Sequence, residues 1–583
     1  MRFAQVLMVL AIGALVGRLA FIQIAQGSYY SKMSVAQVRH DLAVQPLRGG
    51  LFDRHGNILA ISSPTSLVVA DDFQITHPIT EAAVLSPFVG IKPVLLARML
   101  HQKSGYVVLD SNMPIAEGTQ LSNLYLQGIV VLSSSLRSEP NGTIATSVLG
   151  GINNSGSGSA GLEYQYQSLL AGHEGSERVF ASPSGINLPN TRVVLLHKAV
   201  PGVGLELTID TSLQFVAEQA LGQQLRATGG LTGTAIVMDV KTGQILADAS
   251  LVNTKVPAGV LGPIPSWQQS IGVPGIQQTI NNLAVSQVYE PGSVFKIVPF
   301  SAALDSGVVT PTTVLTVPYN VTVGHRLFHD AERHRLEHLS VTQILAQSSN
   351  IGTYEIARRV GESGLLAQVA RLGFGQVTSL DYPGESAGLL VNASQWYPSD
   401  LAALPIGQVD AVTPLQVLDA YNAIANGGIF VEPQLVRGHV QANGAVTPVA
   451  PSLSHMALSP KVANILNHML RQVVVAGTGV NAEIPGYDVA GKTGTSQIPT
   501  PDHRSYIFGA YNASFVGFAP ANNPVLSMIV IIQRPQTVIF GGSVAAPVFQ
   551  RVMSYALHHY GIPASGPIRT VNKNGASVSS DVT

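Results

Sequence analysis

The chain of 583 residues is too long for a single hydrophobic core, so two or more domains are expected. Only 11% of the residues are charged and the formal net charge is −1, which excludes the basic footprint of a nucleic-acid-binding protein. Because there is no cysteine, thiolate metal sites, disulfides and a cysteine nucleophile are excluded as well. The 46% hydrophobic content, with 57 Gly and 35 Pro, is typical of a folded protein with many turns.

The first predicted element is an apolar helix at the N-terminus. From Phe3 to Ile24 the residues are apolar or small except Gln5, Arg18 and Gln23, a run of about the 20 residues that span a bilayer. A cleaved signal peptide is the alternative, but no convincing small-x-small cleavage site follows the run. We therefore predict an uncleaved membrane anchor over residues 1–25. Positive charges lie on both sides of it and leave its orientation open.

The region after the anchor, residues 26–204, is predicted to contain short strands and turns with little helical periodicity. Within it, Gly151–Gly161 is rich in Gly and Ser and is predicted to be a flexible loop. The character of the sequence changes near Pro201–Gly204, where we place a domain boundary. The region therefore reads as a separate domain.

A mixed α/β domain is predicted for residues 205–567. A strand over Leu205–Ile209 precedes Asp210-Thr211-Ser212, which offers N-caps for a helix through Leu221 with apolar residues at helical spacing. Strands predicted near both ends of this region, with helices between them, indicate one antiparallel sheet.

Three further segments of this region carry local signals. Apolar runs flank the turn residues Lys241–Gly243 and Ala521–Pro524, and each pair of runs is predicted to be a β-hairpin. A helix is predicted from Pro547 toward Tyr560, because proline is tolerated in a first turn. The last residues, 568–583, are polar and small and are predicted to be a disordered tail.

A candidate nucleophile lies in Ser293-Val294-Phe295-Lys296. Glu290–Gly292 breaks the chain just before Ser293, and the apolar run Val294–Leu304 predicts a buried helix that begins at the serine. At positions i and i+3 the two side chains share one face, so Lys296 can reach the hydroxyl of Ser293. A free lysine has a pKa near 10.4, which burial, the helix dipole and a second lysine all lower. Pro299 predicts a kink further along this helix.

Two later motifs carry hydroxyl, amide and ammonium groups. Ser348-Ser349-Asn350 is predicted to be a turn between helical segments, where its polar groups either face a cleft or only cap the helices. Lys492-Thr493-Gly494-Thr495 follows an extended segment; one Lys and two Thr hydroxyls can bind a carboxylate, and a backbone N–H can contribute to an oxyanion hole. Lys492 is the candidate for the second lysine. The other Lys-Thr-Gly, at residues 241–243, is interpreted as ordinary turn chemistry.

Four histidines, His325, His329, His334 and His338, alternate with arginines. His334 and His338 have the i, i+4 spacing of metal ligands, but the Glu of a His-Glu-x-x-His arrangement is absent. We therefore predict a solvated charged segment and no metal site there.

The three motifs, in this order, resemble the set of penicillin-binding proteins and class A β-lactamases. Arg48–Ala60, Tyr289–Ser293 and Ser514–Phe518 are similar to segments of class B penicillin-binding proteins, so the resemblance covers nearly the whole chain. It implies a penicillin-binding transpeptidase fold, with an antiparallel sheet between helical layers, and a β-rich, non-catalytic pedestal domain over residues 26–204. It also implies one membrane-spanning helix with the catalytic domain outside the cytoplasm, in the periplasm.

The resemblance implies a peptidoglycan D,D-transpeptidase. Ser293 is then the nucleophile that attacks the penultimate D-Ala of a stem peptide, and the terminal D-Ala leaves before a second stem forms the cross-link. Lys296 is the expected base, Ser348 passes a proton to the leaving amine, and Asn350 orients the substrate. Lys492–Thr495 is expected to hold the terminal carboxylate and to supply one N–H of the oxyanion hole. β-Lactams are expected to acylate Ser293, and neither a cofactor nor a metal is expected.

Two alternatives stay open. A D,D-carboxypeptidase or endopeptidase differs only in whether water or an amine resolves the acyl-enzyme. A non-catalytic β-lactam sensor or scaffold normally has a cytoplasmic signalling region, whereas only two residues precede the predicted span. The expected partner is a membrane glycosyltransferase of the shape, elongation, division and sporulation family, and a chain that ends soon after the catalytic domain favours a septal, cell-division role.

Overall fold

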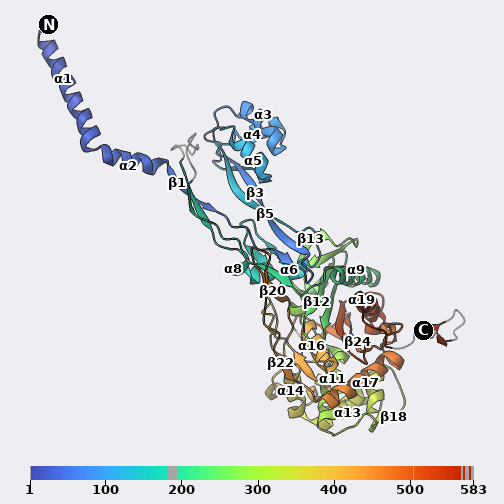
Figure 1. Ribbon diagram of the computed structural model, residues 1–583. Coiled ribbons are helices and arrows are strands. Elements are labelled where there is room, and N and C mark those ends of the chain that lie inside the picture. Colours follow the sequence, from blue (N-terminus) through green and yellow to red (C-terminus); the bar gives the residue numbers. More distant parts are fainter. Residues whose placement is uncertain (1, 181–193, 503, 566–568, 572–576, 580–583) are drawn as a thin grey trace. The chain divides into compact units, whose positions relative to one another are not determined.

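The computed structural model describes residues 2–180, 194–502, 504–565, 569–571 and 577–579. They form two compact units whose segments alternate along the chain (Figure 1). The first unit comprises residues 1–50, 60–138 and 168–204, and the second comprises residues 51–59, 139–167 and 205–583.

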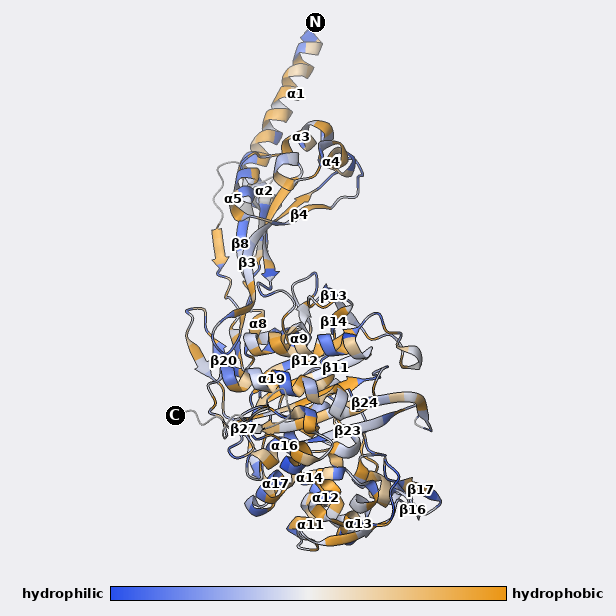
Figure 2. Cartoon of the chain, turned by 90° about the vertical axis from the view of Figure 1, so that its right-hand side faces the viewer, coloured by the Kyte–Doolittle hydropathy of each residue, from blue (hydrophilic) through white to orange (hydrophobic). Residues whose placement is uncertain are grey.

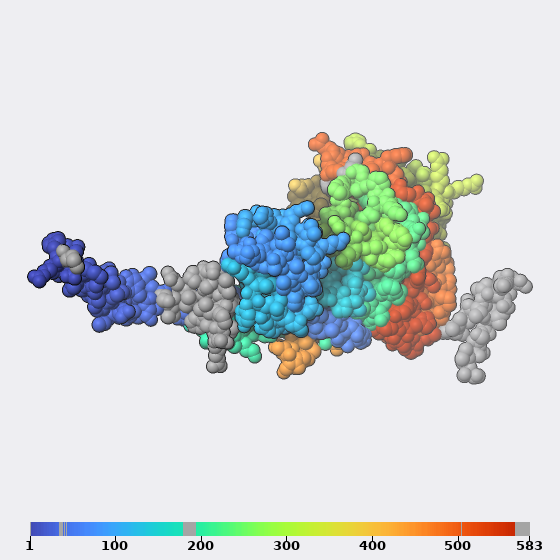
Figure 3. Space-filling model, turned by 90° about the horizontal axis from the view of Figure 1, so that it is seen from above, coloured from blue at the N-terminus to red at the C-terminus, as the bar shows by residue number. Residues whose placement is uncertain are grey.

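The N-terminus of the first unit is a long exposed helix. Helix α1 (Arg2–Ala20) continues into the π-helical turn η1 (Phe21–Ala25), and α2 (Gly27–Val38) follows. The span Arg2–Ala25 has a mean hydropathy of 2.1 and buries none of its residues, which are exposed along the helix in Figure 3. It is long and apolar enough to cross a membrane, as the predicted anchor requires.

The body of the first unit is a small α/β layer. Strand β3 (Ile58–Ala70) pairs antiparallel with β4 (Val107–Met113) and with β5 (Ile129–Ser138). Helices α3 (Pro78–Val89), α4 (Pro93–Met99) and α5 (Ile115–Ser122) bury Leu85, Leu96 and Leu121 in the same core. A separate antiparallel sheet has the order β1 (Arg39–Val44), β8 (Gly175–Phe180) and β9 (Val194–His197).

The sequence pattern does not predict these three helices. They are short, and the N1 prolines Pro78 and Pro93, which are compatible with a helix start, read as loop signals in an otherwise apolar stretch. The expectation of little helix in this region is therefore wrong, while its strands are confirmed.

The second unit is built on a seven-stranded antiparallel sheet. Its strands, in spatial order, are β13 (Ser266–Ser270), β14 (Ile276–Thr279), β12 (Ile245–Asn253), β11 (Thr232–Asp239), β25 (Leu526–Gln533), β24 (Tyr506–Ala519) and β23 (Ala490–Pro499). Strands β11 and β12 form the hairpin predicted around Lys241–Gly243, and β24 and β25 form the one predicted around Ala521–Pro524. The predicted antiparallel sheet is confirmed.

Helices cover both faces of this sheet. Helix α9 (Thr211–Thr228), which Asp210 caps as predicted, and α19 (Ala546–His559) pack on one face. On the other face, α16 (Pro414–Ala425) and α17 (Pro460–Ala476) pack against β25 and β23. Figure 2 shows the apolar strands of the sheet between these helices. The predicted sheet between helical layers is confirmed.

Residues 139–167 contribute to the second unit through short elements. Helix α6 (Thr146–Leu149) is fully buried there, and the backbone N–H of Ala145 donates to Glu218 Oε1 over 2.9 Å. Ser147 N donates to Gln278 Oε1 over 2.8 Å, and the hydroxyl of Tyr382 donates to the carbonyl of Ser147 over 2.9 Å. These bonds join a segment that precedes residue 168 to the sheet that begins after residue 230.

Two loop predictions fare differently. Gly151–Gly161 contains a small hairpin of β6 (Gly151–Ile152) and β7 (Gly158–Ala160), so the flexible loop predicted there is wrong. Its turn is held by the side chain of Asn153, which accepts from the backbone of Ser155 and Ser157. Most of the predicted disordered tail, 568–583, lies outside the described residues; β26 (Arg569–Val571) and β27 (Ser577–Ser579) pair with each other.

The remaining strands of the second unit are short. They are β2 (Leu51–Phe52), β10 (Gly204–Leu207), β15 (Val314–Val317), β16 (Asn320–Val323), β17 (Arg326–His329), β18 (Glu337–Ser340), β19 (Ile429–Val431), β20 (Val436–Val440), β21 (Val446–Pro448) and β22 (Ser454–Met456).

Candidate active site

The candidate nucleophile lies at the start of a buried helix. Ser293 is in the 3-10 turn η3 (Gly292–Lys296), which leads directly into α11 (Ile297–Asp305). Side chains at i and i+3 eclipse in a 3-10 turn, so Ser293 and Lys296 face the same side. The predicted helix start is confirmed, with a tighter first turn than an α-helix.

Gly292 allows this turn to lie close to strand β23. Its φ is +60°, and a Cβ atom there would meet Ser496 Cβ at 3.1 Å and the carbonyl oxygen of Thr495 at 3.3 Å. Only glycine combines this backbone conformation with so close an approach. The turn that carries Ser293 is thereby placed along the edge of the sheet.

Pro299, where a kink was predicted, lies near the start of α11. The chain changes from 3-10 to α geometry between Lys296 and Ile297, so Pro299 is the third residue of α11. A proline in the first turn lacks only an N–H that has no partner within the helix. Pro299 is therefore accommodated without a break in the middle of α11.

Lys296 is buried and directed at the second motif. Its Nζ donates to the carbonyl of Ser348 over 2.5 Å, to Asn350 Oδ1 over 2.8 Å and to Ser348 Oγ over 3.2 Å. Among the residues that the structure describes, it has no hydrogen bond to Ser293. Burial lowers the pKa of Lys296 to about 7, although the charge of Asp330 opposes the shift. A substantial neutral fraction is therefore present near neutral pH and can accept a proton.

Ser348 lies between two lysines. It separates α12 (Val341–Gln347) from α13 (Asn350–Val360) in a left-handed conformation, with φ of 62°. Its Oγ is 3.2 Å from Lys296 Nζ and 2.9 Å from Lys492 Nζ. The turn predicted between two helical segments is confirmed, and the hydroxyl faces the lysines.

Lys492 lies on β23, and its side chain is completely buried. Burial, and then the charge of Lys296, hold the pKa of Lys492 well below its usual range. Two ammonium groups that share one hydroxyl repel each other strongly in a low-dielectric interior, so the pair favours loss of a proton.

Asp330 holds the second motif in place, although no sequence motif pointed to it. Its carboxylate accepts hydrogen bonds from Ser349 Oγ over 2.8 Å, from the backbone N–H of Ile351 over 3.0 Å and from the backbone N–H of Asn350. His334 Nε2 donates to the same carboxylate over 3.0 Å. Asp330 thus orients the first turn of α13, and through it the amide that receives Lys296.

His334 departs from the predicted solvated segment. Its side chain is only 15% exposed and pairs with Asp330. Burial opposes protonation, but the carbonyl of Arg335 and the carboxylate of Asp330 raise the pKa of His334. The prediction that all four histidines lie in a solvated segment is therefore wrong for His334.

The third motif lies on the outermost strand of the sheet. In β23, Thr493 Oγ1 shares a 2.6 Å hydrogen bond with Thr478 Oγ1, and Thr495 Oγ1 accepts from the N–H of Gly541 over 3.2 Å. A Cβ on Gly494 would lie 2.3 Å from Ser514 Oγ, so no side chain fits there. The predicted extended segment is confirmed.

The other Lys-Thr-Gly forms a turn, as predicted. The carboxylate of Asp239 accepts from the backbone of Lys241 and Thr242 and from the Thr242 hydroxyl. Lys241 Nζ donates to Asn426 Oδ1 over 3.0 Å. Of the two copies of the motif, only Lys492 meets Ser348.

The structure therefore brings together most of the candidate residues. Lys296, Ser348, Asn350 and Lys492 form one hydrogen-bonded group, with Ser293 one turn before Lys296. A serine on the same side of the turn as a lysine whose pKa is about 7, and a second hydroxyl that links two lysines, are groups that suit serine acyl transfer.

Two family descriptions match the sequence. Residues 233–554 match "Penicillin binding protein transpeptidase domain", and residues 43–207 match "Penicillin-binding Protein dimerisation domain". The first match includes all three motifs and more than half of the chain. The chain belongs to the penicillin-binding protein transpeptidase family.

Relatives of known name support this membership. The chain is 35% identical over 439 residues to penicillin-binding protein PbpB of Mycolicibacterium smegmatis, an alignment that covers 74% of this chain and 66% of that protein. It is 30% identical to the probable peptidoglycan D,D-transpeptidase PbpC of Pseudomonas aeruginosa over 96% of this chain and 94% of the relative.

A solved structure is similar over most of the chain. It is the crystal structure of penicillin-binding protein 3 from Mycobacterium tuberculosis in complex with aztreonam, with 30% identity and a TM-score of 0.69. The match covers 90% of this chain and 99% of that one.

Proposed function

We propose that this protein is a membrane-anchored peptidoglycan D,D-transpeptidase that works through an acyl-enzyme on Ser293. The observation that carries the proposal is the Ser348 hydroxyl, 3.2 Å from Lys296 Nζ and 2.9 Å from Lys492 Nζ, beside the helical turn of Ser293. The named function of the relative PbpC supports the choice of substrate.

In the acylation step, Ser293 Oγ bonds to the carbonyl carbon of the penultimate D-Ala, and its proton passes to the neutral amine of Lys296. The backbone N–H groups of Ser293 and Thr495 stabilise the oxyanion that forms. The bond to the terminal D-Ala then breaks, and Ser348 relays a proton to the leaving amine. The lysine pair then returns a proton to the hydroxyl of Ser348.

The substrate lies along β23. Hydroxyls of Thr493 and Thr495 bind the terminal carboxylate, and Gly494 lets the peptide backbone come close to the strand. Lys492 is buried, with Nζ on Ser348, so it contributes positive potential and proton relay more than direct contact with the carboxylate. Asn350 holds Lys296 and orients the substrate amide.

The second step forms the cross-link. The amine of a neighbouring stem peptide attacks the ester carbon of Ser293 and gives up a proton to Lys296, which passes a proton to Ser293 Oγ as the ester C–O bond breaks. Hydrolysis by water in place of the amine would make the protein a carboxypeptidase or endopeptidase. Purified protein incubated with stem-peptide substrates is expected to form dimeric peptides, and release of free peptide alone would contradict transpeptidation.

The acyl-enzyme is tested with a fluorescent penicillin. Labelling is expected at Ser293, because a β-lactam carries an acyl group to the same nucleophile, and aztreonam is bound by the similar penicillin-binding protein 3. Ser293→Ala should abolish the label, and Lys241→Ala, in the second Lys-Thr-Gly, is the matched control that should keep it. Labelling that persists in Ser293→Ala contradicts the assignment. Persistent labelling in Ser293→Ala would also exclude Ser293 as the nucleophile of a hydrolase. A sensor or scaffold without turnover is distinguished by the peptide assay and not by the label.

We further propose a single-pass topology with the catalytic unit outside the cytoplasm, in the periplasm. Only there does a catalytic domain meet peptidoglycan, and the exposed apolar helix Arg2–Ala25 supports the anchor. Accessibility of an engineered cysteine in the catalytic unit to an impermeant reagent in intact cells tests the topology. A cysteine that reacts only after lysis contradicts it.

We also propose a membrane glycosyltransferase of the shape, elongation, division and sporulation family as partner, with Arg18 in the span as a contact. A charge within an apolar helix is costly unless it is near the membrane surface or meets a partner. Arg18→Leu is expected to weaken co-purification of the glycosyltransferase from membranes, and unchanged recovery removes Arg18 from the contact.

We also propose that the protein acts at the septum during cell division. A fluorescent fusion in the host cell is expected to gather at division sites, and distribution along the lateral wall alone would favour an elongation role.

A further inference from the structure

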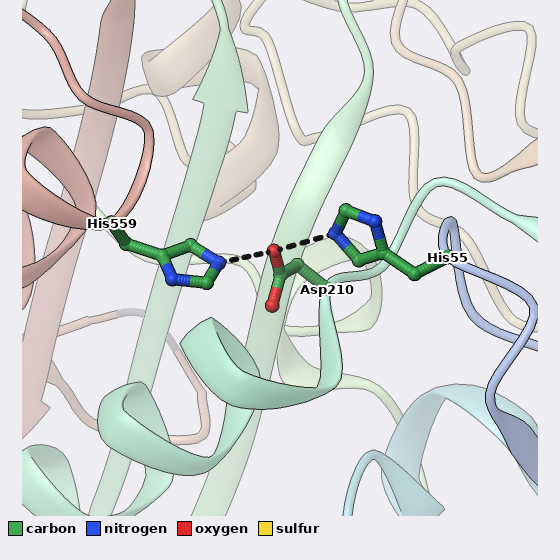
Figure 4. A group of neighbouring side chains, drawn as sticks. All are labelled: His55, Asp210 and His559. Atoms are coloured by element: carbon green, nitrogen blue, oxygen red, sulfur yellow. Dashed lines mark hydrogen bonds and ion pairs between the residues drawn. The ribbon is translucent and has the colours of Figure 1, made fainter.

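A second group of ionisable side chains lies in the catalytic unit, outside the acyl-transfer group. His55 is in the turn between β2 and β3, Asp210 precedes α9, and His559 ends α19. Figure 4 shows both imidazole rings directed at the carboxylate of Asp210. The group belongs to the α9 and α19 layer, whereas α11 and the Ser293 turn lie on the opposite face of the sheet.

The ligand atoms of the group are close enough to share one ion. Asp210 Oδ2 is 3.2 Å from His55 Nε2 and 2.9 Å from His559 Nε2, and all three atoms lie within 4.8 Å of one another. A tetrahedral zinc ion with bonds of about 2.1 Å separates its ligand atoms by about 3.4 Å. Small rotations of the two imidazoles therefore complete the geometry.

The carboxylate is fixed in the orientation that a ligand needs. Asp210 is 1% exposed, and its Oδ1 caps α9 by accepting from Ser212 N over 3.0 Å and Leu213 N over 3.1 Å. Its Oδ2 is left to face the histidines, with the hydroxyl of Tyr560 at 3.0 Å. Supporting contacts of this kind orient metal ligands and tune their affinity.

The two histidines are also positioned by their neighbours. The ring of His559 stacks on Tyr555, with centroids 5.4 Å apart. The turn of His55 is closed by Asp53, which accepts from the His55 N–H over 2.8 Å and from the Thr211 hydroxyl over 2.7 Å. Asp53 thereby ties the turn to the start of α9.

The group is open to solvent on one side. The side chain of His55 is 53% exposed and that of His559 is 30% exposed, so an ion can enter and a water can be the fourth ligand. The adjacent cation, Arg54, lies over the ring of Tyr560 at 5.7 Å from its centroid. Its charge is thus engaged by an aromatic ring beside the site.

We propose that His55, Asp210 and His559 bind one zinc ion. Two imidazoles and one carboxylate suit zinc among the divalent metals, and neither Mg²⁺ nor Ca²⁺ favours a nitrogen-rich site. The ion joins three segments that are far apart in sequence, the 51–59 segment, α9 and the end of α19, and thereby ties them together. The proposal is independent of the transpeptidase chemistry.

The test uses the full, untagged chain in detergent, stripped with a chelator and dialysed. Titration with Zn²⁺ against a competing chromophoric chelator is expected to give one ion per chain. His55→Asn and His559→Asn should each weaken binding by more than about 100-fold, because even supporting residues of metal sites contribute 10–100-fold. His558→Asn is the matched control, since the neighbouring His558 is exposed and its ring bonds the carbonyl of Ser554 and contacts the ring of Tyr487, with no described bond to Asp210.

Co²⁺ provides a second readout, because a tetrahedral site gives it an intense visible spectrum that is expected to disappear in both ligand variants. Zn²⁺ is also expected to raise the melting temperature of the wild type and of His558→Asn, but not of the ligand variants. Absence of stoichiometric binding, or equal binding in all three variants, overturns the proposal, and the group is then a hydrogen-bonded clamp only. Fluorescent-penicillin labelling of Ser293 verifies that each variant is folded.

Discussion

At the scale of single residues, the proposed chemistry depends on the protonation state of Lys296 as well as on its place three residues after Ser293 in the sequence. The Ser-x-x-Lys spacing was enough to predict that Ser293 and Lys296 face one side, because that follows from helical geometry alone. It could not predict that Lys296 donates to Ser348 and Asn350, since those residues are more than fifty positions away. The sequence therefore pointed to the candidate groups, and only the fold shows how they are hydrogen-bonded to one another.

The first residue-scale prediction concerns Lys296. The Lys296→Ala variant is expected to fold, but penicillin should acylate its Ser293 about 10²–10⁴-fold more slowly, because a positioned base usually contributes that much. Stopped-flow acylation with a fluorescent penicillin measures the rate. Lys241→Ala should acylate at the wild-type rate, and an active Lys296→Ala would exclude lysine from the proton transfer.

The pH profile of acylation is a second residue-scale prediction. Because burial lowers the pKa of Lys296 to about 7, its neutral form is scarce at pH 5 and dominant at pH 8. The acylation rate should therefore rise by about tenfold per pH unit below that pKa and level off above it. The midpoint belongs to the coupled pair of Lys296 and Lys492. A rate that does not change between pH 5 and pH 8 would contradict the role of a neutral lysine.

At the scale of elements, the second motif is a junction of two helices. Hairpins and helix ends such as Lys241–Gly243 and Asp210 could be predicted, because turn and cap residues act within a few positions. Asp330 could not be predicted, since it is about twenty residues before the helix it holds and belongs to no short motif. The three helices of the first unit could not be predicted for a similar reason. They are stabilised by a core that they share with β3, β4 and β5, which a local sequence pattern does not show.

The element-scale prediction tests Asp330. Asp330→Asn keeps the size of the side chain but removes the charge that pairs with His334 and accepts from the backbone of α13. A buried hydrogen bond to a charged group contributes about 1.5–3 kcal/mol, so we expect a destabilisation of that order. We also expect slower acylation, because Ser348 and Asn350 lose their support.

Urea unfolding measures the stability and the penicillin assay measures the rate. The matched control is Asp305→Asn, whose carboxylate makes an exposed ion pair with Arg371 and should change neither quantity. Equal behaviour of the two variants would show that Asp330 does not position the motif.

At the scale of the whole molecule, the catalytic unit buries several acids that have no basic partner within the part of the chain that the structure describes. Burial raises the pKa of Glu218 and of Asp248 to about 7 and that of Asp410 to about 6. In the unfolded chain these groups titrate near pH 4, so the native state binds more protons between about pH 4 and pH 7. The contribution of these acids to the free energy of unfolding therefore falls as the pH rises through this window and changes little above it.

The prediction for the whole molecule follows from the raised pKa values of these acids. Through these acids, the melting temperature of the full chain in detergent should be raised at pH 5 relative to pH 8, an effect that the lowered pKa of Lys296 opposes above about pH 7. Asp248→Asn should reduce the effect of the acids, because Asp248 Oδ1 has no hydrogen-bond partner among the described residues and an uncharged amide replaces the group that must ionise. Scanning calorimetry at several pH values measures it, with Asp305→Asn as the exposed control. A pH dependence of the melting temperature that is the same in the wild type and in Asp248→Asn would contradict the assignment of that acid.

The alternation of the two units along the chain determines where the protein can be cut. A fragment that starts at residue 205 would lack α6, and with it the N–H of Ala145 that Glu218 accepts and the backbone carbonyls that receive Tyr382. It would also lack His55 and the rest of its turn. Anyone who designs a soluble form for crystallisation or inhibitor screening should therefore remove the anchor alone, because no single cut within residues 60–204 releases an intact catalytic unit.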